Sequence, residues 1–104
     1  MEQSFKVDLR KGRQMDSLHL QGVIDVNADR HLTEAVKNIT APLVHLDFSG
    51  VGRINSMGIA LLLRSLKMMK AEKQAEIQVS GLSQINSMLF KMTGVFLLAR
   101  EIKH

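Results

Sequence analysis

Residues 46–62 have the sequence Leu-Asp-Phe-Ser-Gly-Val-Gly-Arg-Ile-Asn-Ser-Met-Gly-Ile-Ala-Leu-Leu, and this stretch decides the fold. An apolar run ending at Asp47 and Phe48 predicts a buried strand, and the glycine-rich segment behind it predicts a turn. Ser56 then opens a second apolar run, which predicts a helix to about Lys73. Because α/β domains place their sites beyond the carboxyl ends of strands, we expect the functional residues near Ser56.

The composition predicts one domain that spans residues 1–104, with 45% hydrophobic residues and only 4% aromatic ones. Such a core must be built from Leu, Ile, Val and Met. The absence of cysteine excludes disulfides and suits a reducing cytoplasm, where we expect the protein. No signal peptide is visible, and the longest apolar run, 59–63, is far shorter than the roughly 20 residues of a membrane span, so we expect no membrane insertion.

The net charge of +4 raises the question of a nucleic-acid partner. The basic residues are scattered, however, and no aromatic residues lie between them for base stacking, so we expect no nucleic-acid partner. The four histidines lack metal-ligand spacing, which argues against a metal site. No cofactor-binding loop or catalytic triad can be recognised either, and we therefore expect a protein that is not an enzyme and carries no cofactor.

The apolar pattern predicts the order β-β-α-β-α-β-α-β. The predicted strands and helices cover residues 4–10, 18–24, 27–38, 43–48, 56–73, 75–79, 83–93 and 95–102. Either Asn27 or Asp29 can cap the first of these helices, which ends at Asn38. The first two strands form a hairpin, and the alternation that follows predicts a mixed, mostly parallel sheet in an α/β fold. Gly94 is expected to cap the helix 83–93 in the left-handed conformation. That helix carries Ile85, Met88, Leu89 and Met92 on one face.

The helix that begins at Ser56 has two apolar stripes. At about 3.6 residues per turn, one stripe faces the sheet, and it consists of Ile59, Leu62, Leu63, Leu66 and Met69. A second stripe lies on the opposite side and consists of Met57, Leu61 and Met68. This second stripe is explained either by a neighbouring helix, for which 83–93 is the candidate, or by a partner protein; for Met57, at the helix tip, we expect exposure.

Ser56 stands where a phosphate is physically favoured. The first turn of a helix leaves backbone N–H groups unpaired, and the helix dipole adds positive potential there. Phosphorylation of Ser56 would add charge without breaking the helix and would change the surface that a partner meets. The alternative is that Ser56 or Asn55 is only an N-cap. Asp47 likewise either caps the turn after its strand or lies in a functional crevice above the sheet.

Three motifs resemble those of STAS domains, and in particular those of bacterial anti-sigma-factor antagonists. They are Leu46-Asp47-Phe48-Ser49 followed by Ile54-Asn55-Ser56-Met57-Gly58-Ile59, then Met92-Thr93-Gly94-Val95, and Gly22-Val23-Ile24-Asp25. The resemblance covers essentially the whole chain and implies a single STAS-like domain. Two positions depart from the family pattern, because Asn55 replaces the usual Asp before the serine and Met57 replaces a Ser or Thr.

The resemblance implies a partner switch in bacterial signal transduction and transcription regulation. In that family the unphosphorylated antagonist binds an anti-sigma factor that is a serine kinase related to histidine-kinase ATPases. Phosphorylation, expected here on Ser56, releases the partner, and a PP2C-type phosphatase resets the switch. We expect a chain that is a monomer when free and binds its partner through Asp25, Asp47, Asn55, Met57, Gly58, Leu61 and Arg64.

Two other functions stay open from the sequence. The chain could be a constitutive structural STAS subunit of a transporter, such as a lipid transporter, or of a signalling complex, in which case Ser56 is only a cap. It could also bind a nucleotide or a small ligand in a crevice beside Asp25, Asp47 and Asn55. The loss of the carboxylate at position 55 removes a like charge beside the phosphate and leaves recognition by the family's kinases in question.

Overall fold

The computed structural model describes residues 3–103, so Met1, Glu2 and His104 lie outside the described residues. The predicted order of strands and helices is confirmed, with two short 3-10 helices (η) added to it. The elements are β1 (Lys6–Arg10), β2 (Met15–Ile24), η1 (Val26–Ala28), α1 (Asp29–Lys37), β3 (Leu43–Ile54), α2 (Ser56–Lys73), β4 (Glu76–Ser80), α3 (Gln84–Thr93), η2 (Val95–Leu97) and β5 (Arg100–Glu101).

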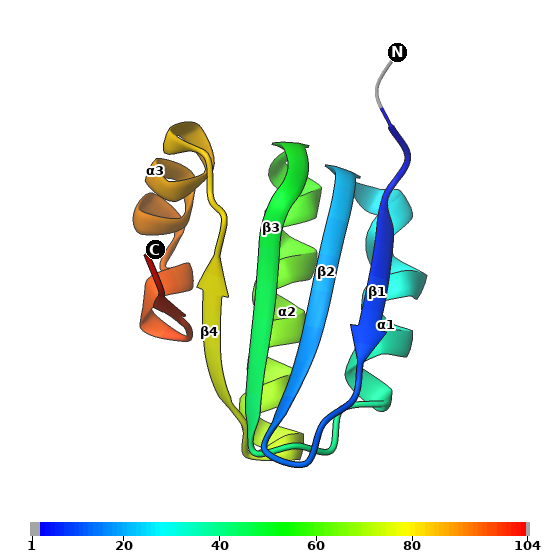
Figure 1. The fold of residues 1–104 in the computed structure, drawn as a ribbon. Helices are drawn as coiled ribbons and strands as arrows, with labels where there is room; N and C mark the ends of the chain where they lie inside the picture. Colours follow the sequence, from blue (N-terminus) through cyan, green and yellow to red (C-terminus); the bar gives the residue numbers. More distant parts are fainter. Residues whose placement is uncertain (1–2, 104) are drawn as a thin grey trace.

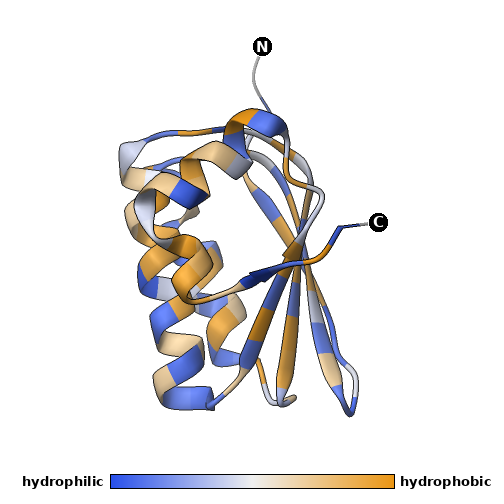
Figure 2. Ribbon diagram, turned by 90° about the vertical axis from the view of Figure 1, so that its left-hand side faces the viewer, coloured by the Kyte–Doolittle hydropathy of each residue, from blue (hydrophilic) through white to orange (hydrophobic). Residues whose placement is uncertain are grey.

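The five strands form one mixed sheet in the order β1-β2-β3-β4-β5 (Figure 1). The β1–β2 hairpin is antiparallel, whereas the other three pairs are parallel, as predicted. The helices lie on one side of the sheet and leave the opposite face open (Figure 2). This arrangement follows from the connections, because each parallel pair requires a crossover that the helices supply.

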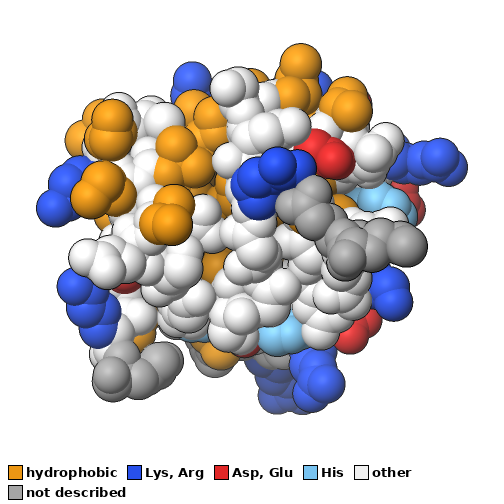
Figure 3. Space-filling view, turned by 90° about the horizontal axis from the view of Figure 1, so that it is seen from above, with side chains coloured by type: hydrophobic (Ala, Val, Ile, Leu, Met, Phe, Trp, Pro, Cys, Tyr) orange, Lys and Arg blue, Asp and Glu red, His pale blue; other side chains and the backbone are white. Residues whose placement is uncertain are grey.

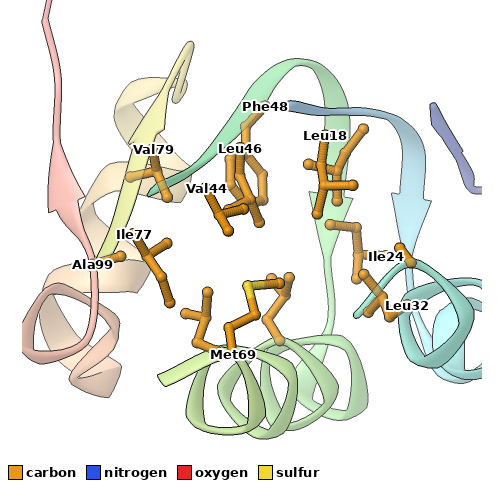
Figure 4. Packing of buried hydrophobic residues seen from close by; sticks show 14 of the residues in the cluster. Leu18, Ile24, Leu32, Val44, Leu46, Phe48, Met69, Ile77, Val79 and Ala99 are labelled. Carbon is orange, nitrogen blue, oxygen red and sulfur yellow. The ribbon is translucent and has the colours of Figure 1, made fainter. Parts of the chain in front are cut away.

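The core lies between the sheet and the helices. Alternate side chains of the central strands, among them Val44 and Leu46, point toward Met69 of α2, and all three are buried (Figure 4). Phe48 meets Phe90 of α3 edge-on, with ring centroids 5.2 Å apart. The helix that packs along α2 is α1, which corrects the expectation that the helix 83–93 would cover the second stripe of α2.

Two strands, β3 and β5, differ most from their predicted bounds. The glycine-rich segment after Phe48 is not a turn, because β3 continues to Ile54 and pairs with β2 beyond two register shifts. Gly50 and Gly52 therefore belong to a bulged strand, in which extra residues bend the backbone without ending the pairing. The last predicted strand is also shorter than expected, because Val95–Leu97 forms a 3-10 helix and only Arg100–Glu101 pairs with β4.

Of the apolar face expected for the third helix, only Leu89 packs against the core. The buried residues of α3 are Asn86 and Phe90, whereas Ile85, Met88 and Met92 are exposed. Tertiary contacts decide this orientation, since Phe90 fills the space beside Phe48. Gly94 does cap α3 in the left-handed conformation, as predicted, with φ of 87°.

At the other end of the sheet, Asp16 links two loops. Its side chain is fully buried, and Oδ2 accepts hydrogen bonds from Lys11 Nζ at 2.8 Å, Thr40 N at 2.8 Å and Ala41 N at 3.0 Å. Oδ1 accepts a hydrogen bond from Gly12 N at 3.1 Å. The carboxylate thus joins the β1–β2 turn to the segment between α1 and β3. Burial favours the uncharged acid, but the Lys11 ammonium and the backbone N–H groups outweigh it and hold the pKa of Asp16 well below its usual range.

Candidate functional site: the amino-terminal tip of α2

The helix α2 begins with a division of roles between two adjacent residues. Asn55 is the N-cap, and its Oδ1 accepts a hydrogen bond from Gly58 N at 2.8 Å. Ser56 is the first helical residue, it is exposed, and its hydroxyl makes no hydrogen bond to the residues described here. The sequence left open whether Asn55 or Ser56 caps the helix, and the structure shows that Asn55 is the N-cap.

The backbone N–H groups of the first turn of α2 divide into two that Asn55 binds and two that no described residue binds. The N–H groups of Gly58 and Ile59 are taken by the side-chain and backbone oxygens of Asn55. Those of Ser56 and Met57 have no hydrogen-bond partner within residues 3–103. Together with the positive end of the helix dipole, these two donors form a favourable environment for a negative group on the Ser56 side chain.

Gly58 fixes the position of this tip against the sheet. It is buried, and a Cβ at this position would lie 2.0 Å from the Ile24 carbonyl oxygen. The same oxygen accepts a hydrogen bond from Asn55 N at 3.2 Å, so the end of β2 and the start of α2 touch backbone to backbone. The predicted partner contact at Gly58 is corrected accordingly, since this residue faces Ile24 inside the domain.

We expect Gly58→Ala to lower the free energy of unfolding by about 1–3 kcal/mol, the usual range for overpacking. Alanine is ordinarily the better helix former by about 1 kcal/mol, so a loss of stability would show that the contact with Ile24 outweighs helix propensity. Gly52→Ala is the matched control, because a Cβ at position 52 meets nothing within 4 Å. Urea unfolding measures both variants, and equal midpoints for the two would contradict the prediction.

Asp25 and the short helix η1 form the other side of the tip. Asp25 follows Ile24 directly, and its Oδ1 accepts a hydrogen bond from Asn27 N at 2.9 Å. The helix η1 contacts α2 and exposes Val26, which is 59% accessible, while Met57 on α2 is 50% accessible. The two elements that meet at the tip therefore each expose one large apolar side chain. Sequence reasoning missed Val26, although an apolar residue directly after a strand-ending Asp was a usable signal.

Two of the predicted contact residues on α2 have roles within the domain. Leu61 is only 6% accessible and belongs to the core, which contradicts its predicted role as a partner contact. Arg64 is exposed, and its guanidinium pairs with the Asp29 carboxylate and so joins α2 to α1. The exposure expected for Met57 is confirmed, so the tip keeps Asp25, Asn55, Ser56 and Met57 as a group.

Asp47 lies elsewhere, on the open face of the sheet. Because β3 does not end at Phe48, Asp47 is in mid-strand and pairs in register with His19 of β2, which places it away from the α2 tip. The crevice that would unite Asp25, Asp47 and Asn55 is therefore not formed. Asp47 Oδ2 lies 2.9 Å from His19 Nδ1, and Oδ1 accepts a hydrogen bond from Ser49 N at 2.9 Å.

The His19–Asp47 pair was not foreseen, because only the strand register brings these residues together. Burial favours the uncharged acid, but the hydrogen bonds from Ser49 and the His19 imidazole lower the pKa of Asp47 below its usual value. Within residues 3–103, no group of three His, Cys, Asp or Glu side chains is arranged to hold a metal ion. No helix in the same range has the length and hydropathy needed to span a bilayer.

The fold and the motifs at the α2 tip define a STAS-type domain. The family model described as "Mlab, STAS domain" matches residues 7–96, and the chain therefore belongs to this STAS family. No curated protein sequence matched the chain.

Solved structures of low sequence identity share the fold. A crystal structure of an anti-sigma factor antagonist from Mycobacterium paratuberculosis has a TM-score of 0.76 at 16% identity, over 94% of this chain and 85% of that one. The anti-sigma factor antagonist SpoIIAA in its unphosphorylated form has a TM-score of 0.68 at 15% identity, over 97% and 89%. The Bacillus cell fate determinant SpoIIAA in the phosphorylated form has a TM-score of 0.65 at 14% identity, over 95% and 91%.

Proposed function

We propose that this chain is an anti-sigma-factor antagonist that acts as a phosphorylation-controlled partner switch. With Ser56 unmodified, the α2 tip binds an anti-sigma factor of the serine-kinase type or a similar regulator. Phosphorylation of Ser56 releases that partner, and a PP2C-type phosphatase restores the binding form. The domain itself is a binding module and not an enzyme.

The observation that carries the proposal is the free hydroxyl of Ser56 at a helix terminus that Asn55 already caps. A serine without a structural role can accept a phosphate at no cost to the fold. The neighbouring N–H groups and the helix dipole would stabilise the roughly −1.5 to −2 charges that a phosphate adds. That same charge would stand next to the exposed Met57, where an apolar partner surface would have to desolvate it.

A second candidate function is that of a constitutive subunit of a transporter or signalling complex. It is favoured by the exposed apolar side chains of Val26 and Met57, because permanent interfaces are more hydrophobic than transient ones. In that case Ser56 would be an interface residue that is never modified.

Intact-mass measurement separates the two functions. Protein purified from its own host under several growth conditions should contain a fraction heavier by one phosphoryl group, and Ser56→Ala protein should lack this fraction. Treatment with a serine phosphatase should remove the added mass. An unmodified protein under every condition, or a modification that persists in Ser56→Ala, would favour the constitutive subunit.

A further inference from the structure

The helix α3 and the following η2 expose a continuous set of large apolar side chains. Their accessible fractions are 80% for Ile85, 57% for Met88, 78% for Met92 and 88% for Leu97. Residues 85, 88 and 92 recur at the spacing of one helical face. Figure 3 shows hydrophobic side chains grouped on the side of the molecule where α3 lies in Figure 1. We call these four residues the α3 face.

The domain does not need the α3 face to hold α3 in place. Asn86 Nδ2 donates a hydrogen bond to the Gly52 carbonyl oxygen at 2.9 Å. Phe90 is fully buried and packs edge-on against Phe48 and Phe96, with ring centroids 5.2 and 6.0 Å apart. The helix is thus anchored by its opposite side, and the exposed apolar residues serve no packing role within residues 3–103. Grouped apolar exposure of this kind marks interaction surfaces.

A groove of about 710 Å³ borders the α3 face and is lined in part by charged side chains. Its lining includes three apolar and three charged side chains, Leu82, Met88, Ile102, Lys91, Glu101 and Lys103. Lys91 is the sole charged residue of α3, and neither lysine forms an ion pair with the described residues. Two lysines against one glutamate leave the groove positive, so an apolar occupant with acidic residues would complement it.

We propose that the α3 face and its groove dock an amphipathic helix of a partner protein, with acidic residues along the edge of that helix. Methionine side chains adapt to the shape of such helices, and the apolar positions of the ligand would contact Ile85, Met88 and Met92. This surface is separate from the Ser56 tip and goes beyond the switch proposed above.

A second copy of the chain fits this surface less well. The helix α3 has 10 residues and is about 15 Å long, whereas a stable interface uses roughly 20–30 residues from each partner. Two copies related by a two-fold axis would also bring two Lys91 side chains together with no acidic residue on either α3 helix. A longer acidic helix avoids both difficulties, because it extends along the groove and pairs with the lysines.

Two synthetic peptides test the proposal with the full chain. Both peptides have the same apolar helical face of Leu and Ile. The residues that flank this face are Glu in the acidic peptide and Lys in the basic one. By fluorescence anisotropy at low salt, the acidic peptide is expected to bind roughly tenfold more tightly than the basic one, and Lys91→Glu is expected to abolish this preference. Equal affinities, or no binding of the acidic peptide, would overturn the proposal.

Matched variants identify the surface that binds. Met88→Gln with Met92→Gln is expected to weaken binding of the acidic peptide roughly tenfold without changing the thermal midpoint, because both side chains are exposed. Val26→Gln makes a comparable change at an exposed apolar residue outside the α3 face and should leave peptide affinity unaltered. Peptide binding that survives the Met88/Met92 change would refute docking at α3. The proposal would also be refuted if the chain sedimented with anionic lipid vesicles, or associated with itself, and the Met88/Met92 change abolished that behaviour.

Discussion

Ser56→Asp is expected to weaken binding of the natural partner about 100-fold, which corresponds to about 2.8 kcal/mol. Ser56→Ala should bind at least as tightly as the wild-type chain. An aspartate at the first position of α2 suits the helix dipole, so the fold should not be harmed and the loss would belong to the interface. The cost arises because a carboxylate beside the exposed Met57 must be desolvated without a partner charge.

The measurement needs a partner, and Ser56→Ala is the form to capture it, because this form is unable to accept the releasing phosphate. Affinities of the three forms for that partner are then compared by calorimetry. Ser17→Asp introduces the same charge on the open face of the sheet and should leave the affinity unchanged. Equal binding by Ser56→Asp and Ser56→Ala would refute the switch, and it would leave peptide docking at the α3 face untouched.

The sequence predicts the fold well because the strong patterns are local ones. Helix 56–73 and its start beside Asn55 follow from apolar periodicity and capping chemistry, and the structure has both. The order of strands and helices, with one hairpin followed by alternation, leaves few topologies to consider. Ser56 could be singled out on the same grounds. That Asn55 alone provides the cap required the structure, because both side chains are competent cap residues.

The failures of prediction concern long-range packing. The glycines after Phe48 are typical of a turn, yet β2 is long enough to pair with β3 as far as Ile54. Because of this pairing, Asp47 lies on the open face of the sheet and not in the predicted crevice. Periodicity in residues 83–93 predicts an apolar face and does not say whether the domain itself covers it. Phe90 and Asn86 occupy the inward positions, whereas Ile85, Met88 and Met92 of the apolar face stay exposed.

Asp16→Asn is expected to lower the free energy of unfolding by about 3 kcal/mol near neutral pH, the lower end of the range for removing one member of a buried ion pair. Asparagine keeps one acceptor oxygen, but its amide would point N–H donors at donors that Asp16 now accepts from, among them Thr40 N and Ala41 N. Urea unfolding at pH 7 measures the difference. Asp8→Asn, at an exposed acid of β1, is the control and should change stability by less than about 0.5 kcal/mol.

The stability difference between wild type and Asp16→Asn should depend on pH, whereas a difference caused by a packing defect would not. An aspartate in the unfolded chain titrates near pH 4, whereas the pKa of Asp16 in the folded chain lies well below that value. The folded state therefore binds fewer protons, and the stability from Asp16 is complete above about pH 5 and is lost as the pH falls below about 4. The gap between wild type and Asp16→Asn should narrow over that range. The pKa of Asp47 is also lowered, but Asp47 contributes the same pH dependence of stability to both proteins. A difference in free energy of unfolding that stays constant or widens toward acid would therefore refute the role of the Asp16 carboxylate.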